Sequence, residues 1–253
     1  MIPIVMVHGA FVGGWSFEWF ERPFRGAGYE VHTPDLRGHG AYEPRERVIG
    51  VSMRDYADDL VAYCQALETA PVLVGHSMGG LLAQMVARRV QARALVLLSP
   101  SAPWGLVSWT VEDAVASLGA HLASLLSNGA IDPGAEVMRY MCLPRLNPAA
   151  AAPILARLRP ESARAVRETM CWWLDPFMTT GVGSGALPMP SLVLAGAQDR
   201  VNTPTTARQV ASRIGAELEI FPDMSHWLLG EPGWQDVAAR ALDWLPAAGR
   251  AAA

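Results

Sequence analysis

Three side chains of the kinds that perform nucleophilic catalysis occur in order along the chain: a serine, an aspartate and a histidine. Ser77 stands in the segment GHSMGG (residues 75–80), and Asp199 and His226 each follow a later apolar segment. A hydroxyl, an imidazole and a carboxylate together can transfer an acyl group through a covalent intermediate. The sequence therefore predicts Ser77 as nucleophile, His226 as general base and Asp199 as the acid that orients the base.

The local setting of Ser77 supports this role. The segment VLVG (residues 72–75) has the pattern of a buried strand, and an apolar helical pattern begins directly after the serine. A sharp turn from strand to helix would hold the serine in an unfavourable backbone conformation and expose its hydroxyl. Gly75 and Gly79 keep side chains out of the crowded turn.

An acyl-transfer site also needs N–H donors for the oxyanion of the tetrahedral intermediate. The backbone N–H of Met78, directly after the nucleophile, is the first candidate. The second is Ala10, because the first predicted strand (residues 2–7) ends in HGAF and Gly9 permits the tight turn that exposes this N–H. We therefore expect the oxyanion hole at Ala10 and Met78.

Asp199 and His226 are expected at the same edge of one sheet as Ser77. Asp199 follows the strand pattern at residues 191–195, and His226 follows the one at 217–221. The carboxyl ends of parallel strands share an edge, so the three side chains should converge there. Asp223 is the alternative acid, although only three residues separate it from His226.

The elements that must position these residues alternate along the chain. Six strand patterns occur, at residues 2–7, 30–33, 72–75, 94–99, 191–195 and 217–221, with helical patterns at 15–27, 53–68, 78–90, 204–214 and 234–245. Several strands are apolar on both faces, as in a parallel sheet covered by helices on both sides. The fold class predicted is therefore α/β, with a doubly wound, mostly parallel sheet of about six strands.

One long stretch interrupts this alternation. Residues 104–188 show helical patterns near 111–126, 133–142 and 149–174, interspersed with prolines. We predict that they form a helical cap over the edge where ligands bind, on a core made of residues 1–103 and 189–253. Substrate contacts are assigned to Phe11, His76, Trp104 and Trp227.

Composition excludes several classes of function. The 253 residues carry a net charge of −4 without a basic run, which argues against nucleic acid as a partner. All 20 basic residues are arginine, so Schiff-base chemistry and Ser–Lys dyads are excluded. Three scattered cysteines without a CxxC motif indicate neither a disulfide framework nor a zinc site. No metal or organic cofactor is implied.

The apolar segments indicate the compartment. The N-terminus is apolar but lacks the charged region and cleavage site of a signal peptide, and no apolar run reaches the length of a membrane span. We expect a cytoplasmic protein without membrane insertion.

Five segments together resemble the α/β-hydrolase superfamily in order and spacing: VHGAFVGGW, TPDLRGHG, VGHSMGG, LAGAQDRV and DMSHWLLGEP. The resemblance covers residues 2–245 and is strongest to the branch of plant methyl esterases, hydroxynitrile lyases and their bacterial esterase relatives. It implies about six parallel strands and ester hydrolysis. Lyases of that branch use a lysine near the triad and a threonine where this chain has Gly9, so cyanohydrin cleavage is disfavoured. Ser77 argues against the members with an aspartate nucleophile.

The expected substrate is a small to medium hydrophobic carboxylic ester, because the predicted cap is rich in tryptophan and methionine. Two alternatives remain open. The same pocket could act as a C–C hydrolase, lactonase, perhydrolase or cofactor-free lyase or cyclase. The protein could instead be a receptor that binds a small molecule without turnover.

Overall fold

The chain is built around one parallel sheet, seen in a computed structural model that describes residues 1–106 and 129–251. Its strands are β1 (Pro3–Val7), β2 (Glu30–His32), β3 (Val72–His76), β4 (Ala94–Leu98), β7 (Ser191–Gly196) and β8 (Glu217–Phe221). They lie in the order β2-β1-β3-β4-β7-β8, and every neighbouring pair is parallel. The predicted strands are confirmed, and each bound differs by one residue at most.

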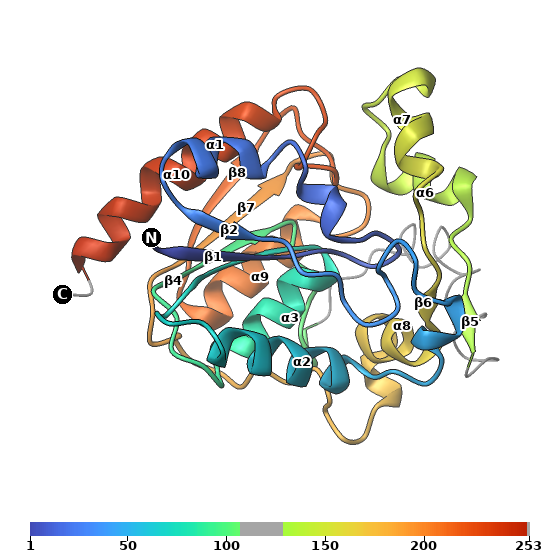
Figure 1. Ribbon diagram of the computed structural model, residues 1–253, viewed down its shortest axis with the longest axis horizontal. Coiled ribbons are helices and arrows are strands. Elements are labelled where there is room, and N and C mark those ends of the chain that lie inside the picture. Colours follow the sequence, from blue (N-terminus) through green and yellow to red (C-terminus); the bar gives the residue numbers. More distant parts are fainter. Residues whose placement is uncertain (107–128, 252–253) are drawn as a thin grey trace.

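Helices cover both faces of this sheet (Figure 1). Helices α1 (Glu21–Gly26) and α10 (Trp234–Ala251) lie on one face, and α2 (Met53–Gln65), α3 (Met78–Ala87) and α9 (Pro204–Ile214) lie on the other. Within β1, Ile4 and Met6 belong to the core under α1 and α10, whereas Val5 and Val7 belong to the core under the other three helices. Successive side chains of a strand point to opposite faces, so strands that are apolar throughout require this double covering.

The region between β4 and β7 contributes further helices. Helices α6 (Ala135–Cys142), α7 (Pro148–Leu155) and α8 (Ala163–Met170) and the small antiparallel pair β5 (Ala130–Ile131) and β6 (Glu161–Ser162) lie beyond the carboxyl ends of the sheet strands (Figure 1). The helical pattern at 111–126 lies outside the described residues. The division into a core and a cap at residues 104–188 stays a prediction.

Two long helical patterns are divided in the structure. The pattern at 149–174 becomes α7, β6, α8 and a 3-10 turn at Trp172–Leu174. Pro160 explains the break, because the residue before a proline avoids helical backbone angles. The Ser162 side chain then caps α8 by accepting a hydrogen bond from the N–H of Ala165.

The pattern at 15–27 is likewise interrupted. It consists of a 3-10 turn at Gly14–Phe17 and the short helix α1. Pro23 lies in the first turn of α1, where a missing N–H is tolerated, but its ring would clash with the carbonyl four residues earlier in a longer helix. By contrast, the predicted start of α2 is confirmed, with Ser52 and Asp55 forming a capping box.

None of the helices in the described parts of the chain is long and apolar enough to cross a membrane.

The strand order reverses direction between β1 and β3, which are neighbours in the sheet. The loops that leave these two strands diverge to opposite faces, and such a switch point is where open α/β sheets bind ligands. Ser77 follows β3, and Gly9 and Ala10 follow β1. The fold therefore brings the predicted nucleophile and the predicted oxyanion loop together.

The first turn of α3 lies almost directly on the end of β1. A Cβ added to Gly79 would lie 2.1 Å from the carbonyl oxygen of Val7 and 2.4 Å from that of His8. A Cβ on Gly75 would lie 2.4 Å from the carbonyl oxygen of Gly79. All three distances are far below van der Waals contact, and the opposing atoms are backbone. Only glycine permits this approach.

We expect Gly79→Ala to destabilise the protein by about 1–3 kcal/mol or more, because the methyl group must push α3 away from β1. Urea denaturation checks this. Gly26→Ala is the matched control, since a Cβ there meets nothing within 4 Å at an exposed position of α1. Alanine should leave stability unchanged or raise it slightly. Equal stability of the two variants would contradict the packing argument.

Candidate active site

Ser77 occupies the turn between β3 and α3 with φ 55° and ψ −123°. A positive φ at a non-glycine residue costs of order 1–3 kcal/mol and persists only where the surroundings enforce it. Here the N–H of Ser77 donates to the carbonyl of Leu98 at 3.0 Å, and its own carbonyl accepts from Gly80 at 2.9 Å and Ser101 at 3.0 Å. The backbone of Ser77 is thus held from β4 and from α3.

The loop after β1 lies directly against this serine. A Cβ added to Gly9 would lie 3.1 Å from the Cβ of Ser77, so the backbone of the loop and the serine side chain are in contact. Ala10 and Met78, the predicted oxyanion donors, both line the cavity into which Ser77 opens. Phe11 also lines it and has a φ of 65°. The oxyanion roles themselves stay a prediction.

His226 and Asp199 form a buried pair beside Ser77. Nδ1 of His226 lies 3.1 and 3.0 Å from the two carboxylate oxygens of Asp199, which identifies Nδ1 as the protonated nitrogen. Oδ1 of Asp199 also accepts hydrogen bonds from the N–H groups of Val201 at 2.8 Å and Asn202 at 2.9 Å. In the neutral imidazole with Nδ1 protonated, Nε2 of His226 is a hydrogen-bond acceptor, the form that a general base requires.

Two further histidines are buried near the turn. Nε2 of His76 donates to the backbone carbonyl of His226 at 2.9 Å, and the two rings lie 4.9 Å apart. Nε2 of His8 accepts from the N–H of Leu36 at 2.9 Å. Burial lowers the pKa of each to about 3, with neighbouring histidines adding to the effect. Both are therefore neutral at ordinary pH and serve as hydrogen-bonding groups.

Ser77 and His226 line a cavity of about 200 Å³. Ser77, His226, Phe11, His76 and Trp227 all lie on its wall. The opposite side of the wall comes from α6 and α8, with Met138, Met141, Cys142, Val166 and Met170.

Trp104 is absent from the cavity wall that the described residues form. Its ring packs edge-on against Trp172, which does line the cavity, and its indole N–H donates to the carbonyl of Asp175 at 3.0 Å. Among the described residues, Trp104 thus contacts the cavity wall through Trp172. Trp109, another aromatic residue of the predicted cap, lies outside the described residues.

Sequence reasoning missed two polar residues next to the site. Nδ2 of Asn202 donates to the carbonyl of Ser99 at 2.8 Å and so ties the Asp199 loop to the end of β4. Glu231 binds the backbone and hydroxyl of Ser225, the residue before His226. Glu231 belongs to the segment DMSHWLLGEP, but the sequence contains no signal that pairs it with Ser225.

Among the described residues, no three histidine, cysteine or acidic side chains gather in a way that could hold a metal ion. Cys142 lines the cavity, but burial, with a smaller contribution from Asp199, raises the pKa of its thiol to about 12. Its sulfur is therefore a poor nucleophile at neutral pH.

Residues 4–240 match the model of the alpha/beta hydrolase family. The protein is an alpha/beta hydrolase. This confirms the family and the fold class predicted from the five sequence segments.

Curated relatives of this alpha/beta hydrolase have several activities. A carbendazim-hydrolysing esterase of Nocardioides sp. strain SG-4G is 36% identical over 108 residues, which cover 41% of this chain and only 43% of the relative. A 2-hydroxymuconate semialdehyde hydrolase of Pseudomonas sp. strain CF600 is 25% identical over 244 residues, covering 89% of this chain and 80% of the relative.

Solved structures extend the likeness over nearly the whole alpha/beta hydrolase chain. A thermophilic esterase of Thermogutta terrifontis superposes with a TM-score of 0.74 at 23% identity, covering 98% of this chain and 91% of that one. A methylesterase of Arabidopsis superposes with a TM-score of 0.71 at 18% identity, covering 97% and 99%. At these identities the likeness establishes the fold.

One buried acid ties the region between β4 and β7 to the rest of this hydrolase. Glu161, in β6, is fully buried between His39 and Tyr56. Its Oε2 lies 3.1 Å from Nε2 of His39, and Oε1 accepts a hydrogen bond from the Tyr56 hydroxyl at 2.7 Å. His39 follows β2 and Tyr56 lies in α2, so one carboxylate joins three segments that are distant in the sequence.

Further contacts support the same junction. The hydroxyl of Ser162 donates to the carbonyl of Val51 at 2.5 Å, and the N–H of Met53 donates to the carboxylate of Glu168 at 2.8 Å. The N–H of Arg159 donates to the carbonyl of Phe11 at 2.8 Å, directly after the predicted oxyanion residue. The helical wall of the cavity is thereby attached to the loop that faces Ser77.

The ion pair should make stability depend on pH. Burial by itself would lower the pKa of His39. The charge and hydrogen bond of Glu161, together with smaller contributions from the Arg37 carbonyl and Asp35, outweigh burial, and the pKa is raised above the ordinary value of 6.5. A group whose pKa rises on folding stabilises the native state at low pH. That contribution is complete below the ordinary pKa and disappears as the pH rises through the raised one.

We therefore expect Glu161→Gln to be less stable than the wild type by a margin that is largest near pH 5.5 and shrinks by pH 8.5. Without the charge, buried His39 can no longer remain protonated at acid pH without cost. Urea denaturation at the two pH values measures the margin. Glu68→Gln, at an exposed position, is the control and should show a small, constant margin. A margin for Glu161→Gln that did not change with pH would mean that the pair is not ionised.

Proposed function

We propose that this alpha/beta hydrolase is a serine carboxylesterase, with Ser77 as nucleophile, His226 as general base and Asp199 as the orienting acid. The observation that carries the proposal is the arrangement around the cavity. Ser77 opens into it from a strained, backbone-held turn, and His226 lines it with Nδ1 bound to Asp199, which leaves Nε2 for a proton.

In the proposed reaction, Nε2 of His226 takes the proton of the Ser77 hydroxyl as Oγ attacks the ester carbonyl. The carbonyl oxygen becomes an oxyanion that accepts hydrogen bonds from the N–H groups of Ala10 and Met78. His226 then passes the proton to the departing alkoxide, and an alcohol leaves. A water molecule, activated in the same way, releases the carboxylic acid and restores Ser77.

The cavity wall supports an apolar substrate. Met138, Met141, Met170 and Val166 face the catalytic side of a cavity of about 200 Å³. Thioether and aliphatic side chains bind acyl or alkyl groups through dispersion and burial and adapt to irregular shapes. We propose a small to medium hydrophobic carboxylic ester as the substrate.

A second candidate is hydrolysis of a carbon–carbon bond. It is favoured by the relative named as a 2-hydroxymuconate semialdehyde hydrolase, which aligns with 89% of this chain. The same serine, base and oxyanion donors could serve that reaction. Parallel assays with 2-hydroxymuconate semialdehyde and with p-nitrophenyl esters separate the two, since the preferred substrate should have the higher kcat/KM.

We expect Ser77→Ala to lower kcat/KM for p-nitrophenyl butyrate by about 10³-fold or more, because no group remains to form the acyl-enzyme. A fluorophosphonate should label the wild type at Ser77 and not the variant. The exposed Ser184→Ala is the matched control and should keep full activity. Wild-type protein that neither turned over any ester nor accepted the label would favour the receptor alternative.

We expect Val166→Phe, in α8, to shift the preference toward shorter acyl chains. The larger ring would fill part of the cavity, so kcat/KM for p-nitrophenyl octanoate should fall by about 10-fold or more relative to the acetate. The ratio of the two values in wild type and variant is the measurement. An unchanged ratio would place the acyl group away from α8.

A further inference from the structure

A buried carboxylate forms two hydrogen bonds with the residue that precedes His226. The N–H of Ser225 donates to Oε1 of Glu231, and the Ser225 hydroxyl donates to Oε2 at 2.5 Å. Ser225 and Glu231 are both fully buried. Both oxygens of one side chain are thus used to hold one residue, whose backbone leads directly into His226.

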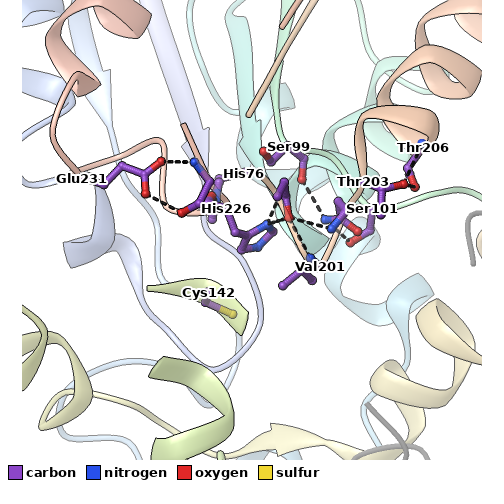
Figure 2. A network of polar contacts seen from close by, with 12 residues as sticks. His76, Ser99, Ser101, Cys142, Val201, Thr203, Thr206, His226 and Glu231 are labelled. Atoms are coloured by element: carbon purple, nitrogen blue, oxygen red, sulfur yellow. Dashed lines mark hydrogen bonds and ion pairs between the residues drawn. The ribbon is translucent and has the colours of Figure 1, made fainter. Parts of the chain in front are cut away.

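Glu231 is itself well anchored. Its N–H donates to the carbonyl of Trp227 at 3.1 Å, and its carbonyl accepts from the N–H of Trp234, the first residue of α10, at 3.0 Å. The carboxylate therefore projects from a closed turn attached to a long helix. In Figure 2, Glu231 lies on one side of His226, and Val201 and Ser101 lie on the other.

The segment that carries His226 is also held at other points. The carbonyl of His226 accepts the Nε2–H of His76 at 2.9 Å, and the ring is bound by Asp199. A Cβ added to Gly196 would lie 2.3 Å from the carbonyl oxygen of Ser225, so this segment lies directly on the end of β7. These contacts fix the ring and the carbonyl of residue 226. The backbone just before it is held by the N–H of Gln198, which donates to the carbonyl of Met224 at 2.9 Å, and by Glu231 at Ser225.

Burying a carboxylate is energetically unfavourable, because the charged group loses its hydration. Desolvation raises the pKa of Glu231, and the two donors of Ser225 act in the opposite direction by stabilising the charge. An apolar side chain would fill the volume without the free-energy cost of desolvating a charge, but it could accept no hydrogen bond from Ser225. The carboxylate is suited to fixing the direction of the chain at this place.

We propose that Glu231 is a positioning residue for the general base: through Ser225 it fixes the backbone of residue 226 and so directs the His226 ring toward Ser77. The inference rests on the proposed function. Proton transfer is steeply sensitive to the direction of the imidazole, whereas substrate binding in the apolar cavity is not. The contribution of Glu231 should therefore appear in kcat and not in KM.

The test compares Glu231→Ala, Glu231→Gln, Ser225→Ala and the double variant Glu231→Ala with Ser225→Ala, using p-nitrophenyl butyrate. For Glu231→Ala we expect kcat to fall by roughly 10- to 100-fold while KM changes less than about 2-fold. Glutamine should restore most of the loss, because its amide oxygen accepts the Ser225 N–H and its NH₂ group donates to the Ser225 hydroxyl.

The double variant tests whether Glu231 acts through Ser225. Its kcat should be no lower than that of Glu231→Ala alone, because the two residues form one unit. Multiplicative losses in the double variant would overturn the proposed route. Asp236→Ala, in the exposed first turn of α10, is the control and should leave kcat unchanged. Melting temperatures confirm that each variant is folded at the assay temperature.

The remaining outcomes are distinct. If Glu231→Ala does not fold, Glu231→Gln and Ser225→Ala still test the positioning role. We then expect a fall in kcat for Ser225→Ala and near-normal activity for Glu231→Gln. A lowered melting temperature with unchanged kcat would make Glu231 merely structural and overturn the inference. Ser77→Ala in the same assay distinguishes failure of the proposed function from failure of the positioning role. Full activity in Ser77→Ala would refute the serine mechanism. Loss of activity in Ser77→Ala together with normal kcat in Glu231→Ala would refute only the positioning role.

Discussion

The close approach of α3 to the end of β1 is the constraint on which the site depends. Because Gly79 carries no Cβ, the first turn of the helix reaches the carbonyl oxygens of Val7 and His8. That contact forces the chain between β3 and α3 into the tight turn where Ser77 has a positive φ. It also sets Gly9 against Ser77, so the nucleophile and the proposed oxyanion loop are fixed by the same packing.

The histidines around this turn show how environment divides one residue type into different roles. His8 and His76 are buried without an acid on their rings, and their pKa values of about 3 keep them neutral. His39 lies equally deep, but the carboxylate of Glu161 raises its pKa. His226 has a carboxylate on Nδ1 and a cavity on its other side. Position in the sequence does not distinguish these environments; the partners do.

Much of the fold and of the candidate site could be predicted from local patterns. The strands are apolar on both faces, and Ser77, Asp199 and His226 each follow a strand, so their convergence comes from the topology of a parallel sheet. The side of the cavity wall that α6 and α8 form could not be predicted in this way. Pro160 divides a pattern that looks helical. Trp104 packs against Trp172 and is not part of the wall that the described residues form, although its type suits an apolar ligand.

The roles of two of the buried glutamates, Glu161 and Glu231, were also beyond sequence reasoning, for a physical reason. Glu161 is recognised only by its partners His39 and Tyr56, which lie more than a hundred residues earlier in the chain. Glu231 lies six residues from Ser225, but a turn with no periodic pattern brings them together. Acidic residues in a sequence are ordinarily read as surface positions, and only tertiary structure identifies the exceptions.

The methionine side chains of the cavity wall have a consequence for the resistance of the protein to oxidation. Met78, Met138, Met141 and Met170 place four thioethers around the space where a substrate would lie. Oxidation converts a thioether into a polar sulfoxide, so an oxidant that entered the cavity would make an apolar wall hydrophilic. A bound apolar molecule would shield the same sulfur atoms. Resistance to peroxide should therefore depend on whether the cavity is occupied, even though serine, histidine and aspartate are themselves untouched.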